Sequence, residues 1–271
     1  MTFLSLSALF SLAALAGAPM PAHLQTVAPV GLPQLSQSAD WRVRQQAAAI
    51  AAWQSDPELA ERAWGVQPLE TRAGFLRFSD PALRDSGMAP VLVERLLTLG
   101  EPEGVRMALV DLLPRAGGDW SSALSAAYPT EDQPGVRMLM VETARRAAPD
   151  DARELVTLGA SDSAQTVRAA AMRLAPRLDD STLADLVLAG LSDTAPQVRA
   201  DAARSAGWMA LDGARQPLSG LLSDADSDVR LSALRALEKL DPAALRAHPQ
   251  LSALQADADP RVARAAQSAA R

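Results

Sequence analysis

The sequence predicts an all-α fold, an α-solenoid (superhelix) of about eight helical hairpins. The first observation is a Val-Arg pair that recurs every 31 residues, at Val105-Arg106, Val136-Arg137, Val167-Arg168, Val198-Arg199 and Val229-Arg230. The second is helical apolar spacing after each valine, and the third is a short acidic loop before it. A fixed period of this length is typical of repeat proteins, in which each unit packs only on its neighbours.

Each valine is predicted to begin the buried stripe of the second helix of its unit, helix B. Apolar residues follow four and seven positions later, as in Val167, Ala171 and Leu174, and this spacing is one face of a 3.6-period helix. The start signals agree, because Pro260 stands in the expected first turn of the last helix B and Asp259 stands just before that turn.

A first helix, helix A, is predicted before each helix B. Apolar-periodic runs at 152–158, 183–191 and 214–222 mark it, and another helix A is expected to begin at Asp241-Pro242. The repeat is therefore helix A, a short acidic loop, helix B and a turn. One such hairpin does not bury its apolar stripe alone, so several copies must stack.

The ends of the repeat array are less regular. Val43-Arg44 lies two periods before Val105, and Thr71-Arg72 is the best candidate for a degenerate copy between them. In the last unit Ala263 replaces the arginine, and the spacing stretches to 33 residues. These copies bring the expected number of hairpins to eight.

The loop aspartate and the Val-Arg pair that heads an alanine-rich helix B resemble HEAT repeats. They resemble more closely the short HEAT-like units of the phycobilin-lyase family, over residues 40–271. The resemblance implies that helix B lines the concave side of the solenoid and helix A the convex side. It also implies a ladder between loop aspartates and helix arginines of neighbouring repeats, and it specifies the fold without specifying a function.

The ladder has a physical reason. An arginine fork can bond the aspartate of its own or an adjacent unit and so bridge two layers. The expected members are Asp162, Arg168, Asp193, Arg199, Asp224 and Arg230. The alternative is that the arginines form a row of anion-binding groups.

The side of helix B opposite the core is predicted to be a partner-binding surface. Positions two, five, six and nine after each valine are expected on this side, and apolar residues are frequent there. At the sixth position the charge changes from Asp111 and Glu142 to arginines further along the chain. The expected contact residues are Met107, Met138, Met172, Arg173, Arg204, Leu231 and Arg235. Tight side-by-side packing of the B helices is the alternative, and the five tryptophans are expected in the core or at its edges.

The sequence predicts no catalytic residue, no cofactor site and no metal site. It has two histidines and no cysteine, and it lacks a glycine-rich phosphate loop and metal-ligand spacing. The run Asp224, Asp226 and Asp228 loosely resembles a calcium loop, but the glycine and the distal glutamate are absent. Helix capping is the better explanation of these aspartates. A net charge of −6 disfavours nonspecific nucleic-acid binding.

The N-terminal residues have a different composition. No charged side chain precedes Asp40, and an apolar stretch from Phe3 ends in Ala16-Gly17-Ala18. This predicts a signal peptide at 1–18, a proline-containing linker at 19–39 and the repeat domain at 40–271. The stretch is too short for a stable membrane span. An uncleaved anchor or a capping helix remains open.

The leading functional prediction is a bacterial, periplasmic or secreted, non-enzymatic scaffold of the cell envelope that binds a protein partner. One alternative is a cytoplasmic subunit of a lyase complex of the phycobilin type, if the N-terminus is misread. Another is a polyanion binder that uses Arg173, Arg204 and Arg235. The sequence specifies neither the partner nor the oligomeric state.

Overall fold

A computed structural model of the chain describes residues 93, 96–97, 103–115, 119–178 and 180–271. The predicted signal peptide, the linker and the early repeat copies at 43–44 and 71–72 lie outside the described residues. The chain divides into two compact units, Met1–Glu131 and Asp132–Arg271, and each is described by itself.

The described part of the first unit contains one helix B followed by one helix A. Helix α9 (Glu103–Leu112) carries Val105, and η1 (Leu113–Arg115) extends it. Helix α10 (Trp120–Ala127) follows and leads into η2 (Tyr128–Thr130). Trp120 and Tyr128 are both buried, as expected for aromatic residues that pack between helices.

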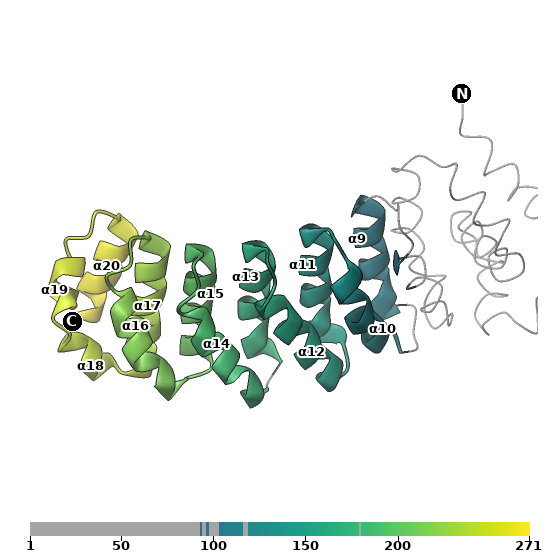
Figure 1. Cartoon of the computed structure of the whole chain (residues 1–271). Helices are drawn as coiled ribbons and strands as arrows, with labels where there is room; N and C mark the ends of the chain where they lie inside the picture. Colours follow the sequence, from purple (N-terminus) through teal and green to yellow (C-terminus); the bar gives the residue numbers. More distant parts are fainter. Residues whose placement is uncertain (1–92, 94–95, 98–102, 116–118, 179) are drawn as a thin grey trace, which may run out of the picture. The chain divides into compact units, whose positions relative to one another are not determined.

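The second unit is a row of helical hairpins in two layers (Figure 1). The B helices are α11 (Pro134–Thr143), α13 (Gln165–Leu174), α15 (Pro196–Trp208), α17 (Ser227–Leu240) and α20 (Pro260–Ala269). The A helices are α12 (Pro149–Ala160), α14 (Ala184–Gly190) and α16 (Arg215–Leu221), and the last helix A is split into α18 (Pro242–Arg246) and α19 (Gln250–Leu254). Short 3₁₀ turns are η3 (Ala144–Arg146), η4 (Ala175–Arg177), η5 (Ser181–Leu183) and η6 (Asp212–Ala214).

Within the second unit each helix B packs on the helix B of the next repeat, and each helix A packs on the helix B that follows it. The repeating valine is the third residue of every described helix B, and its side chain is fully buried. Full burial of a valine side chain contributes about 1.5–3 kcal/mol. Among the described residues there is no strand, and the predicted all-α solenoid is confirmed.

The position five residues after the valine is buried in α9, α11, α13, α15 and α17, and the prediction that it faces solvent is wrong for these helices. It is occupied by Val110, Val141, Met172, Ala203 and Leu234, each at most 2% exposed. On a helix this position lies on the flank, about 140° from the valine, and successive B helices pack on that flank. The alternative of side-by-side packing is therefore correct for this position.

The stretched spacing of the last repeat has a local cause. Its helix A is interrupted between α18 and α19, where His248 and Pro249 stand. The backbone N–H of Gln250 donates to His248 Nδ1 at 3.3 Å, and His248 Nε2 lies 2.9 Å from the Ser219 hydroxyl. The imidazole therefore links the interrupted helix to α16 of the preceding repeat.

Candidate functional site

The recurring arginine joins each repeat to the next through its whole guanidinium group. Arg168 Nε and Nη2 donate to Asp193 Oδ2 and Oδ1 at 2.7 and 2.9 Å. Arg168 Nη1 donates to the backbone oxygens of Asp162 and Ser163 at 2.9 and 3.0 Å. The side chain therefore binds the loop carbonyls of its own repeat and the carboxylate of the following one. The sequence left open whether the arginine bonds the aspartate of its own or of an adjacent repeat. The carboxylate that it bonds is the one of the following repeat.

The same pairing repeats along the second unit, where we call it the loop ladder. Its pairs are Arg137–Asp162, Arg168–Asp193, Arg199–Asp224 and Arg230–Asp257. In the first unit Arg106 and Glu131 form the equivalent ion pair at 3.1 Å. Sequence reasoning omitted Arg137 and Asp257 from the expected members. The Val-Arg period already marked Arg137, whereas the two-residue insertion in the last repeat displaced Asp257 from the expected spacing.

Each ladder aspartate also holds the turn in which it lies. Asp193 Oδ1 accepts the backbone N–H of Ala195 at 2.8 Å, two residues later, and Asp162, Asp224 and Asp257 do the same. A carboxylate that accepts both guanidinium and backbone donors fixes the start of helix B relative to the preceding repeat. This position tolerates no neutral substitute without leaving donors unpaired.

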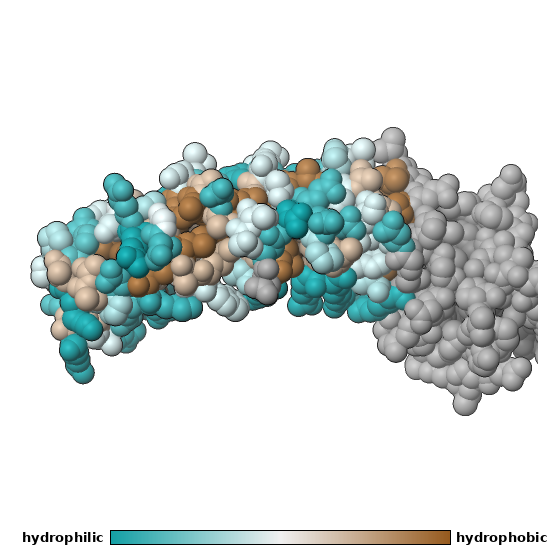
Figure 2. All heavy atoms as spheres, turned by 90° about the horizontal axis from the view of Figure 1, so that it is seen from below, coloured by the Kyte–Doolittle hydropathy of each residue, from teal (hydrophilic) through white to brown (hydrophobic). Residues whose placement is uncertain are grey.

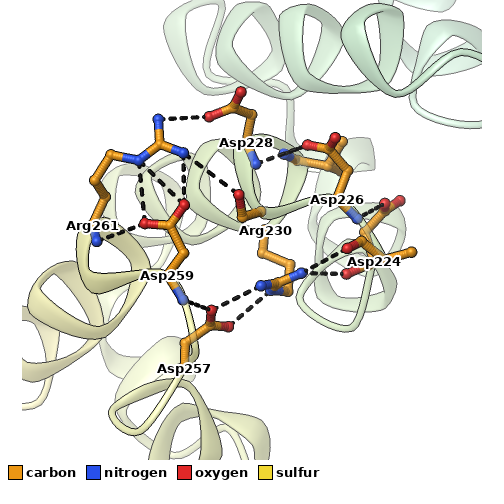
Figure 3. Close-up of polar contacts among 10 residues, drawn as sticks. Asp224, Asp226, Asp228, Arg230, Asp257, Asp259 and Arg261 are labelled. Carbon is orange, nitrogen blue, oxygen red and sulfur yellow. Dashed lines mark hydrogen bonds and ion pairs between the residues drawn. The ribbon is translucent and has the colours of Figure 1, made fainter.

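Figure 3 shows the last ladder position and the aspartates around it. Asp226 caps α17 by accepting the N–H groups of Asp228 and Val229 at 2.8 and 3.2 Å. Arg261 Nη1 lies 2.8 Å from Asp228, and Arg261 Nη2 lies 2.6 Å from Asp259. Every carboxylate of this loop is already bonded to an arginine or a backbone N–H. Capping and pairing therefore account for the resemblance to a calcium loop.

Pairing with arginine lowers the pKa values of the ladder carboxylates. The hydrogen bond from Arg168 holds the pKa of Asp193 below its ordinary value, and Arg230 does the same to the pKa of Asp257. Burial raises the pKa of Asp224, but the bonds from Arg199 and from a backbone N–H outweigh it and leave that pKa lowered. All three carboxylates are therefore ionised at neutral pH.

The predicted partner surface is only partly exposed. Met107 and Met138 are half-buried, whereas Met172 and Leu231 are 2% and 8% exposed. Met172 lies on the flank that packs against the next helix B, and Leu231 is buried where the B helices pack together. The prediction that these two side chains are exposed is therefore wrong. What remains exposed on this side is mainly charged. We call it the B face, defined by the half-buried or exposed side chains on this side of α11, α13, α15, α17 and α20, together with the buried Asp201 beneath them. These side chains are Met138, Glu142, Arg173, Arg204, Trp208, Arg235, Glu238, Lys239 and Arg264.

A polar network crosses the B face and links four B helices. Arg173 reaches Glu142 of the previous helix B at 3.3 Å and Asp201 of the next at 3.1 Å. Asp201 is only 2% exposed and is bonded to Arg204 as well. Arg204 Nη1 in turn donates to the Ser232 hydroxyl at 3.0 Å. Sequence reasoning missed Asp201, although an acid at a position that is alanine in α9 and α13 could have indicated it.

The network ends at α17, and the next arginines along the chain do not contribute to it. Arg235 occupies the position of Arg173 and Arg204, but Ala265 stands where its acceptor would be in α20. Arg235 and Arg264 are exposed. Among the hydrogen bonds and ion pairs of the described residues, neither side chain takes part. On the B face the arginines of α13 and α15 are therefore bonded to neighbouring helices, whereas Arg235 of α17 and Arg264 of α20 are exposed and form no ion pair with the described residues.

Trp208 is exposed on the B face, and its predicted packing in the core or at its edge is wrong. It lies four residues after Arg204, at the end of α15, and is 59% exposed. The guanidinium of Arg177 lies 6.0 Å from the centre of its ring. The backbone of the turn after Trp208 is also unusual, because Ala210, two residues later, has a positive φ of 53°. Trp41, Trp53 and Trp64 lie outside the described residues.

Within the part of the chain that the structure describes, no group of three or more potential metal-binding side chains is found. Both ring nitrogens of His248 are bonded, one to the Ser219 hydroxyl and the other to the backbone N–H of Gln250. No described helix is long and apolar enough to cross a membrane.

Comparison with known proteins identifies the repeat class. A family profile described as HEAT repeats matches residues 184–271, which span α14 to α20. The crystal structure of an engineered protein is 20% identical and aligns over 93% of this chain and 96% of its own, with a TM-score of 0.41. No curated protein matches.

The predicted HEAT repeats are therefore confirmed over residues 184–271, and the described hairpins form an α-solenoid. Stacked repeats of this kind present extended surfaces on which protein partners bind. Neither the family profile nor the engineered structure distinguishes the phycobilin-lyase type from other HEAT repeats.

Proposed function

We propose that this protein is a non-enzymatic scaffold of the cell envelope that binds a protein partner on the B face. The observation that carries the proposal is that some arginines bond neighbouring repeats together while others are left exposed. The ladder arginines are bonded to the following repeat, whereas Arg235 and Arg264 are exposed. Arg204 is bonded to Asp201, but its side chain is still 55% exposed. Exposed side chains that stacking does not use are available to a partner.

Affinity capture in the native organism tests the proposal. The tagged full-length chain is cross-linked in cells, and the cross-linked peptides are identified by mass spectrometry. We expect a protein whose cross-links fall on helix-B residues of α15, α17 and α20. Cross-links confined to the A helices, α12, α14 and α16, would contradict the B face as the binding surface.

The envelope location rests on the N-terminal sequence, and its test is independent of the partner. The intact mass of the protein isolated from native cells should lack residues 1–18, and the protein should fractionate with periplasmic or secreted proteins. Retention of Met1 together with cytoplasmic fractionation would favour the lyase-type subunit instead.

A further inference from the structure

The B face of the second unit carries positive charge in a protein whose net charge is negative. Within the B helices its basic residues are Arg173, Arg204, Arg235, Lys239 and Arg264, and its acidic residues are Glu142, Asp201 and Glu238. Asp201 is buried beneath Arg173 and Arg204, and Glu142 is paired with Arg173. From α15 onwards Glu238 is the one exposed acid among these residues. The exposed charge of this half is therefore basic.

We propose that this basic strip, Arg204, Arg235 and Arg264, binds an extended segment of a partner protein with an acidic side chain at every third residue. The inference deepens the proposed function, since it names the chemistry of the partner. Successive packed helices lie roughly 8–10 Å apart. A polyproline II segment advances about 9 Å in three residues, and every third side chain points to the same side. Its acidic residues would therefore meet one arginine per repeat.

The register of the strip supports this match. Arg173 contacts Asp201, and Arg204 contacts Ser232, each 28 residues further along the chain. The two contacts are equivalent, so α13, α15 and α17 stack with their sixth positions in line. Arg235 continues the line on α17. Arg264 stands at the second position after the valine of α20, next to Ala265, which occupies the position of Asp201 and Ser232.

Trp208 provides the apolar part of the same site. It is on α15, one turn beyond Arg204, and Arg177 lies against its ring while more than half of the side chain remains exposed. Rigid, exposed aromatic side chains dominate many protein interfaces, and proline-rich segments bind against aromatic rings. Proline or apolar residues between the acids of the segment would lie against this ring. The view in Figure 2 shows apolar side chains gathered along the middle of the second unit, with hydrophilic side chains on both sides of them.

The charge pattern also favours an acidic protein segment over other ligands for this strip. The first 39 residues of the chain contain no acid, so they do not provide the complementary charge. A nucleic acid has an uninterrupted row of phosphates that would also meet Glu238 and Glu142, and the protein as a whole carries a net charge of −6. A protein segment with spaced acids matches spaced arginines without this repulsion.

Fluorescence anisotropy with a labelled peptide of three Glu-Pro-Pro triplets tests the proposal on the full-length chain. The control peptide has the same composition but three adjacent glutamates followed by six prolines. We expect the triplet peptide to bind several-fold more tightly than the control peptide and to weaken as salt increases. Equal affinity for the two peptides, or no binding of either, would overturn the inference.

The protein variants localise the binding. R235Q/R264Q removes two exposed cations that form no ion pair with the described residues, and it should weaken peptide binding about tenfold. W208A should weaken it to a similar extent. The matched control R215Q/R246Q removes the same charge from the A helices α16 and α18 and should leave the affinity unchanged. Equal loss in the control variant would show a nonspecific charge effect and refute the site.

Two further measurements separate this inference from its alternatives. Oligothymidylate of equal charge should bind less tightly than the triplet peptide, and tighter binding would favour a polyanion site instead. Light scattering should give the same mass for the wild type and for R235Q/R264Q. A dimer that R235Q/R264Q dissociates would assign the strip to self-association. If a partner captured from cells binds R235Q/R264Q as tightly as wild type, the acidic-segment inference fails while the proposed scaffold function stands.

Discussion

Replacing Arg199 with alanine should destabilise the protein by leaving a buried carboxylate without its counterion. Arg199 Nε and Nη2 bond Asp224 at 2.8 and 2.9 Å, and Nη1 bonds the backbone oxygens of Asp193 and Thr194 at 2.8 and 3.0 Å. The two charged side chains are 17% and 8% exposed. The variant would leave Asp224 with the N–H of Asp226 as its remaining bonded donor.

The size of the effect follows from this burial. Removing one partner of a buried ion pair costs about 3–5 kcal/mol, and the partial exposure of Arg199 places this pair near the lower value, about 3 kcal/mol. For a chain of this size each kilocalorie lowers the melting temperature by about 2–4 °C. The expected loss is therefore about 6–12 °C. Arg199 contributes to stability through four bonds, so the assay should detect the change easily.

Urea unfolding and thermal melting followed by circular dichroism measure the effect. Arg215 provides the matched control, because its pair with Asp212 is 48% and 85% exposed. Arg215→Ala should change the free energy of unfolding by less than about 0.5 kcal/mol. The double variant Arg199→Ala/Asp224→Ala should be less destabilised than the sum of the two single variants. A melting temperature of Arg199→Ala equal to that of wild type would refute the structural role of the ladder.

Three other predictions concern the same packing. Pairing lowers the pKa of Asp193 and Asp224, so the stability that the ladder contributes is present above the unfolded pKa of about 3.9. This stability is lost as the pH falls through the lower pKa values of the folded state. Melting curves between pH 7 and 2 should show the loss, with a shallower decline in Arg199→Ala. Gly207→Ala should destabilise by about 1–3 kcal/mol, since a Cβ there would lie 2.9 Å from the Ala236 backbone, and unchanged urea unfolding would contradict the close approach of α15 and α17. Ala210→Gly should stabilise by up to about 1 kcal/mol, because φ is 53° at this residue, and a lower urea midpoint would show that its conformation is unstrained.

The period of the sequence determined the fold. Val167, Val198 and Val229 stand at equal spacing, each followed by helical apolar positions, and only stacked hairpins bury such stripes. The loop aspartates and the arginines that follow the valines could be predicted to pair, because no other charged groups recur with them. Local chemistry was therefore sufficient for the elements, the caps and the type of ladder contact.

Tertiary structure decided which helix faces meet. Periodicity places Met172 away from the core valine, but it does not show that the neighbouring helix B covers that flank. Nor does the repeat pattern indicate the direction of the ladder, in which each arginine bonds the carboxylate of the following repeat. The union of Arg173, Asp201 and Arg204 requires three residues from two helices, and a one-dimensional pattern does not bring them together. Neighbouring repeats exclude water from some charged groups and leave others exposed, and for this reason only the packed structure distinguishes ladder arginines from those available to a partner.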